Sequence, residues 1–347
     1  MNTNINNCFQ GSHALVDFLN PACRGALPLV ELTDPTLNPF LNSNNRVRIF
    51  GCLGFMNPFL NTKGDVVYNM LKMAQNSGRL EGVHTIVENS SGNTAAALGV
   101  LGPLFGIRRI RAITPWDRAP GKGEVIRLLS VDEELVKRDG IKLAQNMGKE
   151  KGCINLNQYD NPDNPKTFAT YLAPGIWEQT NGALTVFSAA LGSSGTLIGC
   201  SDFFRSQKSE RPSGEKVFIV GVNVAPNQAV PGARTLERLQ EITLPWKEAM
   251  NTRMEVGTKE SYVMSLRLIQ RGLFAGPSSG LALVGLHEML KAWLTQNGDF
   301  SGLRNKAGDV LAVVVFADTF LPYMDKYSTV LDPEDFSADG GYIGDNI

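Results

Sequence analysis

The sequence predicts an α/β protein of the doubly wound type, with largely parallel sheets covered by helices. Short apolar runs rich in β-branched residues alternate with longer stretches of helical character. Runs of this composition are typical of strands that are buried on both faces of a parallel sheet. The chain has 347 residues, of which 43% are hydrophobic, so it can bury a large core, and its length predicts about two domains.

Five apolar runs are the predicted strands. They are HTIVEN (84–89), IRRIRAIT (107–114), ALTVFSAAL (183–191), KVFIVGVNV (216–224) and VLAVVVF (310–316). The predicted helices lie between them and span Asp65–Asn76, Thr94–Phe105, Thr196–Arg205, Tyr262–Arg271 and Ser279–Gln296. The segment NQYDNPDNPKTF (157–168) is crowded with Asn, Asp and Pro, which predicts a hinge between domains.

Composition excludes several classes of function. The chain carries 33 basic and 34 acidic residues, and a net charge of -1 does not attract nucleic acid or a membrane surface. We therefore expect small-molecule partners. Five scattered cysteines without a Cys-x-x-Cys pair predict reduced thiols rather than disulfides or a zinc site. Because the N-terminus has no secretion signal and no run is long enough to span a bilayer, we expect a cytoplasmic protein.

Four segments rich in glycine or serine fall where the pattern places strand-to-helix junctions. They are NPFLNTKGD (57–65), ENSSGNTAA (88–96), GSSGT (192–196) and GPSSG (276–280). Ligands bind at such junctions in open α/β sheets because backbone N–H groups are free there. A single segment of this kind is more typical of a capped turn, so the signal lies in the set and its order.

The ordered set resembles the cysteine synthase and cystathionine β-synthase branch of fold-type II pyridoxal phosphate enzymes. The motifs of that family are an Asn-Pro lead-in to a lysine, a Thr-Ser-Gly-Asn-Thr loop, a Gln-Phe-x-Asn-Pro segment, a Gly-Thr-Gly-Gly-Thr loop and a Gly-x-Ser-Ser-Gly turn. The matching segments here begin at Asn57, Ser90, Gln158, Gly192 and Gly276. The similarity runs from Pro28 to Leu331, which is nearly the whole chain.

The resemblance implies pyridoxal 5'-phosphate as cofactor and a role for each motif residue. Catalytic Lys63 would hold the cofactor as a Schiff base, and Asn93 would bond its phenolic oxygen. The remaining cofactor-binding residues would be Gly192, Ser193, Ser194, Gly195 and Thr196 at the phosphate and Ser278 at the ring nitrogen. The substrate-binding residues would be Ser90, Ser91, Thr94 and Gln158 at the carboxylate, with Arg234 as a candidate for an anionic leaving group.

Physical chemistry supports three of these roles. An amine forms an imine only when deprotonated, and burial near Leu60 and Thr62 would lower the pKa of Lys63. The turn 192–196 precedes a predicted helix, whose N-terminal N–H groups favour a phosphate. A neutral Ser278 hydroxyl holds the ring nitrogen protonated less well than a carboxylate, which disfavours transamination and favours loss of a β-leaving group.

The resemblance also implies a domain arrangement and a reaction. Residues 56–163 would form a small mobile domain that grips the substrate, residues 1–55 and 164–331 a large domain that holds the phosphate, and residues 332–347 a loose acidic tail. The reaction would be β-replacement on O-acetylserine or O-phosphoserine through an aminoacrylate intermediate, in a homodimer. Alternatives are a serine or threonine dehydratase that only eliminates, and a catalytically silent partner protein.

Several residues depart from the family pattern. Lys63-Gly64-Asp65 stands where Lys-Asp-Arg is common, and Ala95 replaces a glycine. These changes flank the cofactor without removing its anchor, so they bear on the substrate more than on the chemistry. His13, His84 and His287 have no ligand-like spacing, which predicts structural roles and no metal site.

Overall fold

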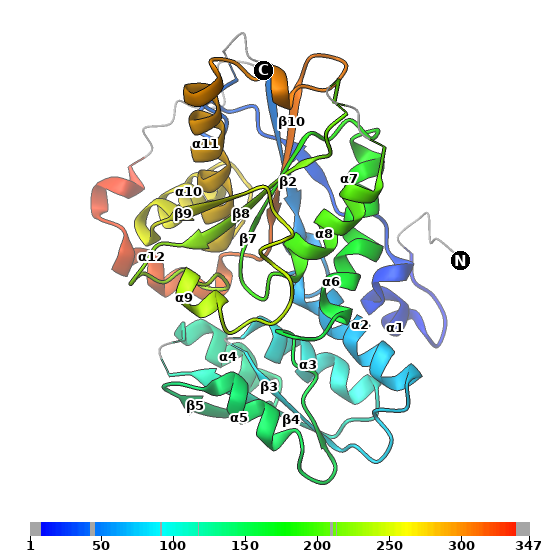
Figure 1. Ribbon diagram of the computed structural model, residues 1–347. Coiled ribbons are helices and arrows are strands. Elements are labelled where there is room, and N and C mark those ends of the chain that lie inside the picture. The colour runs from blue at the N-terminus through cyan, green and yellow to red at the C-terminus, as the bar shows by residue number, and fades with distance from the viewer. Residues whose placement is uncertain are drawn as a thin grey trace.

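The protein folds around two β-sheets, seen in a computed structural model that describes residues 8–41, 46–90, 92–116, 118–208, 211–212 and 214–337. The larger sheet has six strands in the order β1-β2-β10-β7-β8-β9, and the smaller has four in the order β5-β4-β3-β6. Every strand pair is parallel except β1 with β2. Helices flank both sheets (Figure 1), which confirms the predicted α/β fold.

The larger sheet is enclosed between two helical layers. Its strands are β1 (Leu29–Glu31), β2 (Val47–Leu53), β7 (Val186–Ala190), β8 (Phe218–Val224), β9 (Thr252–Val256) and β10 (Val310–Phe316). The long helix α11 (Pro277–Asn297) packs across β7, β8, β9 and β10, with α10 (Thr258–Gln270) beside it. The helices α6 (Asp163–Thr167), α7 (Ala173–Gln179) and α8 (Gly195–Ser206) lie on the other side of the sheet (Figure 1).

The smaller sheet is assembled from one continuous stretch of chain. Its strands are β3 (Thr85–Asn89), β4 (Arg109–Pro115), β5 (Asp132–Val136) and β6 (Cys153–Ile154). Its helices are α3 (Asn93–Leu104), α4 (Pro120–Leu128) and α5 (Gly140–Met147), while α2 (Lys63–Asn76) packs on both α3 and α6. Helix α2 therefore links the two sheets.

The remaining elements are short. They are α1 (Ala14–Leu19), α9 (Leu236–Leu239) and α12 (Met324–Val330), the 3-10 helices η1 (Pro21–Cys23), η2 (Gly54–Met56), η4 (Ser301–Leu303), η5 (Leu321–Tyr323) and η6 (Pro333–Phe336), and a π-helical turn η3 (Phe168–Leu172). Within the described part of the chain, no helix has the length and apolar character needed to cross a bilayer.

The five predicted strands are β3, β4, β7, β8 and β10, and the five predicted helices are α2, α3, α8, α10 and α11, each displaced by a few residues at most. The prediction that the segment 276–280 follows a strand is wrong, because the chain reaches it from α10. Before this segment, Ala275 makes only an isolated bridge to Thr319. In the predicted hinge, helix α6 begins at Asp163, so the second half of that segment is helical.

Side chains of β10 alternate between two hydrophobic cores. Val313 and Val315 face the core that continues into the smaller sheet, whereas Val314 and Phe316 face the core under α10 and α11. Successive side chains of a strand point to opposite faces, so a continuous apolar run indicates that both faces are buried. The burial of all seven β10 residues agrees with this reading of VLAVVVF.

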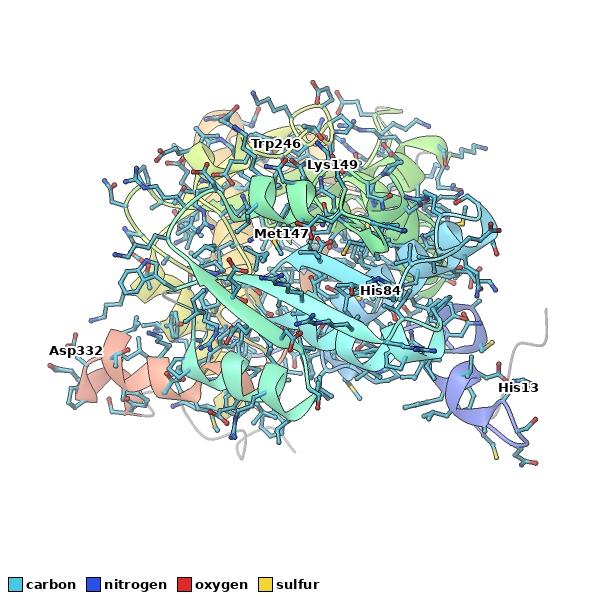
Figure 2. The ribbon with its side chains drawn as sticks, turned by 90° about the horizontal axis from the view of Figure 1, so that it is seen from below. His13, His84, Met147, Lys149, Trp246 and Asp332 are labelled. Carbon is cyan, nitrogen blue, oxygen red and sulfur yellow. The ribbon has the colours of Figure 1, made fainter. Side chains whose placement is uncertain are left out.

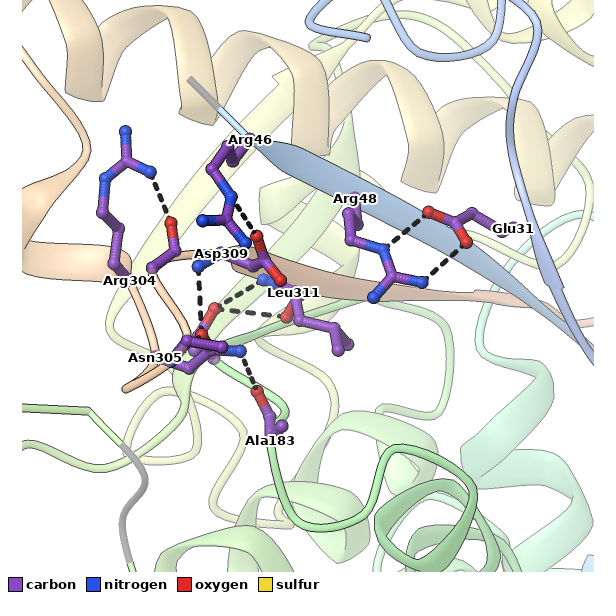
Figure 3. A network of polar contacts seen from close by, with 11 residues as sticks. Glu31, Arg46, Arg48, Ala183, Arg304, Asn305, Asp309 and Leu311 are labelled. Carbon is purple, nitrogen blue, oxygen red and sulfur yellow. Dashed lines mark hydrogen bonds and ion pairs between the residues drawn. The ribbon is translucent and has the colours of Figure 1, made fainter. Parts of the chain in front are cut away.

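A polar network fixes the amino ends of β2 and β10 (Figure 3). The Arg46 guanidinium lies 2.7 Å from the Asp309 carboxylate, and Arg48 makes two bonds of 2.8 Å to Glu31. The Asn305 side chain accepts the Asp309 N–H at 3.0 Å and donates to the Ala183 carbonyl at 3.3 Å. This end of the sheet is thus held by side-chain bonds, while its carboxyl end is left for the candidate site.

The predicted loose tail begins with η6. Lys259 lies 2.6 Å from the Asp332 carboxylate and 3.1 Å from that of Asp335, which fastens this part of the tail to α10. Residues 338–347 fall outside the described part of the chain.

Candidate active site

A cavity of about 520 Å³ opens where the carboxyl ends of strands from both sheets meet. Asn89 at the end of β3, Pro115 at the end of β4 and Val224 at the end of β8 all line it. This is the position at which ligands bind in open parallel sheets. A larger hollow of about 660 Å³ over α10 and α11 contains none of the predicted site residues.

Most of the predicted site residues come together in the 520 Å³ cavity. Those that line it are Lys63, Ser90, Asn93, Thr94, Gln158, Gly192, Ser193 and Arg234. Ser194, Gly195, Thr196 and Ser278 are buried at the N-termini of α8 and α11 and do not line it. Ser91 lies outside the described residues.

Lys63 is the first residue of α2, and two asparagines shape the turn before it. The Asn57 side chain donates to the Asn61 carbonyl at 2.6 Å, and the Asn61 side chain accepts the Lys63 backbone N–H at 2.9 Å. Burial lowers the pKa of the Lys63 amine, and the nearby Asp318 carboxylate partly opposes this shift. The expectation that burial depresses the pKa of this lysine is confirmed.

Packing explains why Gly64 and Asp65 depart from the family pattern. A Cβ atom at residue 64 would lie 1.9 Å from the Phe59 ring, so a side chain cannot be accommodated without movement. Asp65 is partly buried and pairs with Arg24, which lies between the 3-10 helix η1 and the strand β1 in sequence. Gly64 and Asp65 therefore both contribute to the packing of α2 against its neighbours. Lys63 still lines the cavity.

The residues predicted to bind the substrate carboxylate form a connected set. The Ser90 hydroxyl accepts the backbone N–H groups of Gly92 at 3.1 Å and Ala95 at 3.2 Å, which shapes the loop before α3. Thr94 donates to the Gln158 side-chain oxygen at 3.1 Å. The start of α3 and the 157–168 segment are thus joined by a hydrogen bond.

Glu88, which the sequence analysis did not select, holds Gln158 in place. Its carboxylate accepts the backbone N–H groups of Asn157 at 2.9 Å and Gln158 at 3.1 Å, together with the Asn155 side chain at 3.0 Å. Burial raises the pKa of Glu88 to about 7, although these N–H groups favour its charged form. Glu88, a residue of β3, therefore positions a predicted substrate residue.

The turn before α8 has the features of an anion cradle. Ser194 has a left-handed backbone with φ of 63°, and its buried hydroxyl has no hydrogen-bond partner among the described residues. The neighbouring Ser193 hydroxyl accepts a bond of 3.0 Å from Asn164. A buried polar atom without a partner is costly, so a phosphate at this helix N-terminus fits the turn.

The sequence analysis also missed Asp318, which accepts a hydrogen bond from Ser278. Asp318, two residues past the end of β10, accepts bonds from Asn93 at 2.8 Å, Ser278 at 3.3 Å and the Tyr323 hydroxyl. The position of Asp318 after a buried strand was the signal that could have identified it. The hydroxyl predicted to face the ring nitrogen thus has a buried carboxylate behind it.

Arg234 lines the cavity, but other groups bind its guanidinium. One nitrogen donates to the Arg238 carbonyl and to the Glu241 carboxylate, both at 2.9 Å. The guanidinium also lies over the Tyr159 ring, 4.5 Å from its centre. Its role in reading a leaving group stays a prediction.

The histidines take no part in the cavity. His13 and His84 lie at separate places on the molecule (Figure 2), and buried His287 contacts the Leu37 carbonyl at 3.0 Å. Among the described residues, no group of three His, Cys, Asp or Glu side chains is arranged to hold a metal ion.

Comparison with known proteins places the cavity in context. Cysteine synthase B of Escherichia coli is 28% identical over 281 residues, which cover 77% of this chain and 86% of the relative. A cysteine synthase from Entamoeba histolytica has the same fold, with a TM-score of 0.72 at 22% identity over 96% of this chain and 94% of that structure. An O-ureido-L-serine synthase variant gives a TM-score of 0.71 at 19% identity, covering 89% of this chain and 92% of that structure.

The family match covers the elements that build the cavity. Residues 28–299 match the pyridoxal-phosphate dependent enzymes, a range that runs from β1 through α11. This range contains Lys63, the loop before α3 and the turn before α8 described above. Since the match takes in most of the chain, the protein belongs to the family of pyridoxal-phosphate dependent enzymes.

Proposed function

We propose that the protein catalyses β-replacement on an O-activated serine, with O-acetylserine or O-phosphoserine as the donor and sulfide as the default nucleophile. The observation that carries the proposal is the cavity that joins the half-buried Lys63 to the Thr94 and Gln158 pair. The similarity to a protein named cysteine synthase B supports the same reaction class.

The bound cofactor would supply an electron sink for the carbanion formed when the α-proton leaves. Residues at the phosphate end would orient it, with Ser193, Ser194 and Thr196 donating hydroxyl groups and Gly192 and Gly195 leaving room for the backbone. Asn93 would bond the phenolic oxygen, and Ser278 the ring nitrogen. Each of these assignments is part of the proposal.

Lys63 would perform two tasks. Its ε-nitrogen would hold the cofactor in the resting enzyme, and its free amine would take the α-proton of the substrate. Ser90, Thr94 and Gln158 would hold the substrate carboxylate, so that the α-hydrogen is directed toward the lysine. Contact of the 157–168 segment with the bound substrate would close the smaller sheet over the cavity.

The proposal is tested by product analysis with purified protein and each donor, with and without sulfide. Formation of cysteine supports replacement, whereas a keto acid formed regardless of sulfide identifies a dehydratase. Turnover of neither donor identifies a silent protein and contradicts the proposal.

Borohydride reduction followed by peptide mass spectrometry tests the anchor. We expect the cofactor on Lys63 and no fixed cofactor in Lys63→Ala. Lys326→Ala is the matched control, since Lys326 lines the same cavity and is partly exposed. An adduct on any other lysine contradicts the assignment.

A further inference from the structure

A second lysine is buried in the candidate active site. Lys122 lies in the first turn of α4, lines the cavity with Lys63, and is only 3% exposed. A lysine is almost never buried to this extent unless its charge has a partner. The family motifs discussed above do not include this residue.

The described residues give the Lys122 ammonium little compensation. It lies over the Tyr323 ring, 4.8 Å from the ring centre. None of the ion pairs among the described residues involves it, and Asp318 acts on it only as a nearby charge. Burial lowers the pKa of Lys122 to about 8, with Lys63 acting in the same direction. An anion that enters the cavity would therefore meet a poorly compensated cation.

The Lys122 side chain crosses the loop before α3. A Cβ atom at Gly92 would lie 2.5 Å from the Lys122 side chain, and the φ of 150° at Gly92 is one that other residues rarely adopt. The loop thus keeps a glycine where the lysine stem passes over its backbone. This close approach brings the lysine to the N-terminus of a helix of 12 residues.

The N-terminus of α3 adds donors beside the lysine. The N–H of Ala95 binds the Ser90 hydroxyl and that of Ala96 binds the Gly92 carbonyl. Asn93 and Thr94 are the first two residues of the helix, and their N–H groups have no partner among the described residues. Free N–H groups, the helix dipole and a buried cation together favour a small carboxylate.

We propose that Lys122 binds the α-carboxylate of the amino acid substrate and gives the site its preference for a charged carboxylate. This inference rests on the proposed function, because it assumes that an amino acid occupies the cavity. In it, the neutral donors Ser90, Thr94 and Gln158 orient the carboxylate and Lys122 supplies the opposite charge.

The test compares L-alanine with L-alaninamide, which differ in the carboxylate and carry no leaving group. Dissociation constants are measured from the absorbance change of the bound cofactor for the wild type and Lys122→Met. Methionine keeps an unbranched stem to pack on Gly92 and removes the ammonium, with its charge and its N–H donors. We expect L-alanine to bind about 10- to 150-fold more weakly, as for one lost charge-assisted hydrogen bond, and L-alaninamide to change less than about 3-fold.

Lys326→Met is the matched control, because it removes the same charge from the more exposed rim of the cavity. We expect it to leave both dissociation constants within about 3-fold of the wild type, as for a solvated surface charge. Unchanged cofactor absorbance and unfolding temperature in Lys122→Met show that the variant is folded and loaded.

Three results would overturn the inference. Equal weakening of both ligands by Lys122→Met means that the lysine does not read the carboxylate, and no weakening means that it does not touch the ligand. A loss confined to O-phosphoserine, with L-alanine and O-acetylserine unaffected, assigns it to the leaving group instead. If wild-type protein binds L-alanine but turns over no donor, the proposed function fails while the Lys122 comparison still stands.

Discussion

Replacing Ser194 by glycine should have opposite effects on the free protein and on cofactor binding. Ser194 has a left-handed backbone and a buried hydroxyl without a partner among the described residues. Left-handed backbone costs a non-glycine residue about 1–2 kcal/mol, and an unpaired buried hydroxyl about 1–3 kcal/mol. The greater flexibility that glycine gives the unfolded chain offsets about 0.4–1 kcal/mol of the gain.

Ser194→Gly should therefore stabilise the cofactor-free protein by about 1–5 kcal/mol. Each kcal/mol corresponds to roughly 1.5 °C in unfolding temperature for a chain of this length. The same change removes a donor to the phosphate and should weaken cofactor binding by about 10- to 150-fold. Thermal unfolding with and without cofactor measures both effects, and a fluorescence or absorbance titration gives the cofactor dissociation constant.

Ser201→Ala is the matched control, because Ser201 lies on the same helix and also has a buried hydroxyl without a partner among the described residues. It should stabilise the free and loaded proteins equally and leave cofactor affinity unchanged. Destabilisation of the free protein by Ser194→Gly would refute the argument from backbone strain and the unpaired hydroxyl. Unchanged cofactor affinity would refute the assignment of this turn to the phosphate.

Three more outcomes are expected. Gly64→Ala should destabilise the protein by about 1–3 kcal/mol, since its Cβ atom meets the Phe59 ring, and Phe59→Ala should restore part of the loss in chemical denaturation. Arg234→Ala should lower kcat/KM for O-phosphoserine more than for O-acetylserine, and an equal response to both donors would leave the arginine a purely structural role. Glu88 has a pKa raised from 4.5 to about 7 by burial, so the folded state retains a proton that the unfolded state has lost. The free energy of unfolding relative to Glu88→Gln should therefore fall as the pH rises from about 4.5 to 7, and a pH-independent difference between the two proteins would contradict this.

The sequence predicted five strands with long apolar runs, and it missed the edge strands β1, β5, β6 and β9 together with the inner strand β2. Strand β5 reads DEELV, which carries too much charge to suggest a strand. In the structure these charges pair with the neighbouring strand, Arg109 with Asp132 and Arg111 with Glu134. Charge pairs between neighbouring strands depend on tertiary contacts, so the local sequence pattern does not predict them.

The candidate site was predictable where residues follow strands in motifs, and not where a charge is buried by distant packing. Segments such as GSSGT predict a turn followed by the start of a helix, and both are present in the structure. Lys122 in the sequence PGKGE is typical of a solvated helix start, yet Gly92 and Tyr323 cover it. Only the assembled loops make this lysine part of the cavity.

The polar network at the amino ends of β2 and β10 lies at the opposite end of the larger sheet from the cavity. Arg46, Asp309 and Asn305 lie at the amino ends of β2 and β10 (Figure 3). The cavity lies at the carboxyl ends of the strands. We therefore expect substitutions among these three residues to change resistance to heat or denaturant without changing the lining of the cavity. Resistance to denaturation could therefore be engineered at the amino ends of these strands without substituting a residue that lines the cavity.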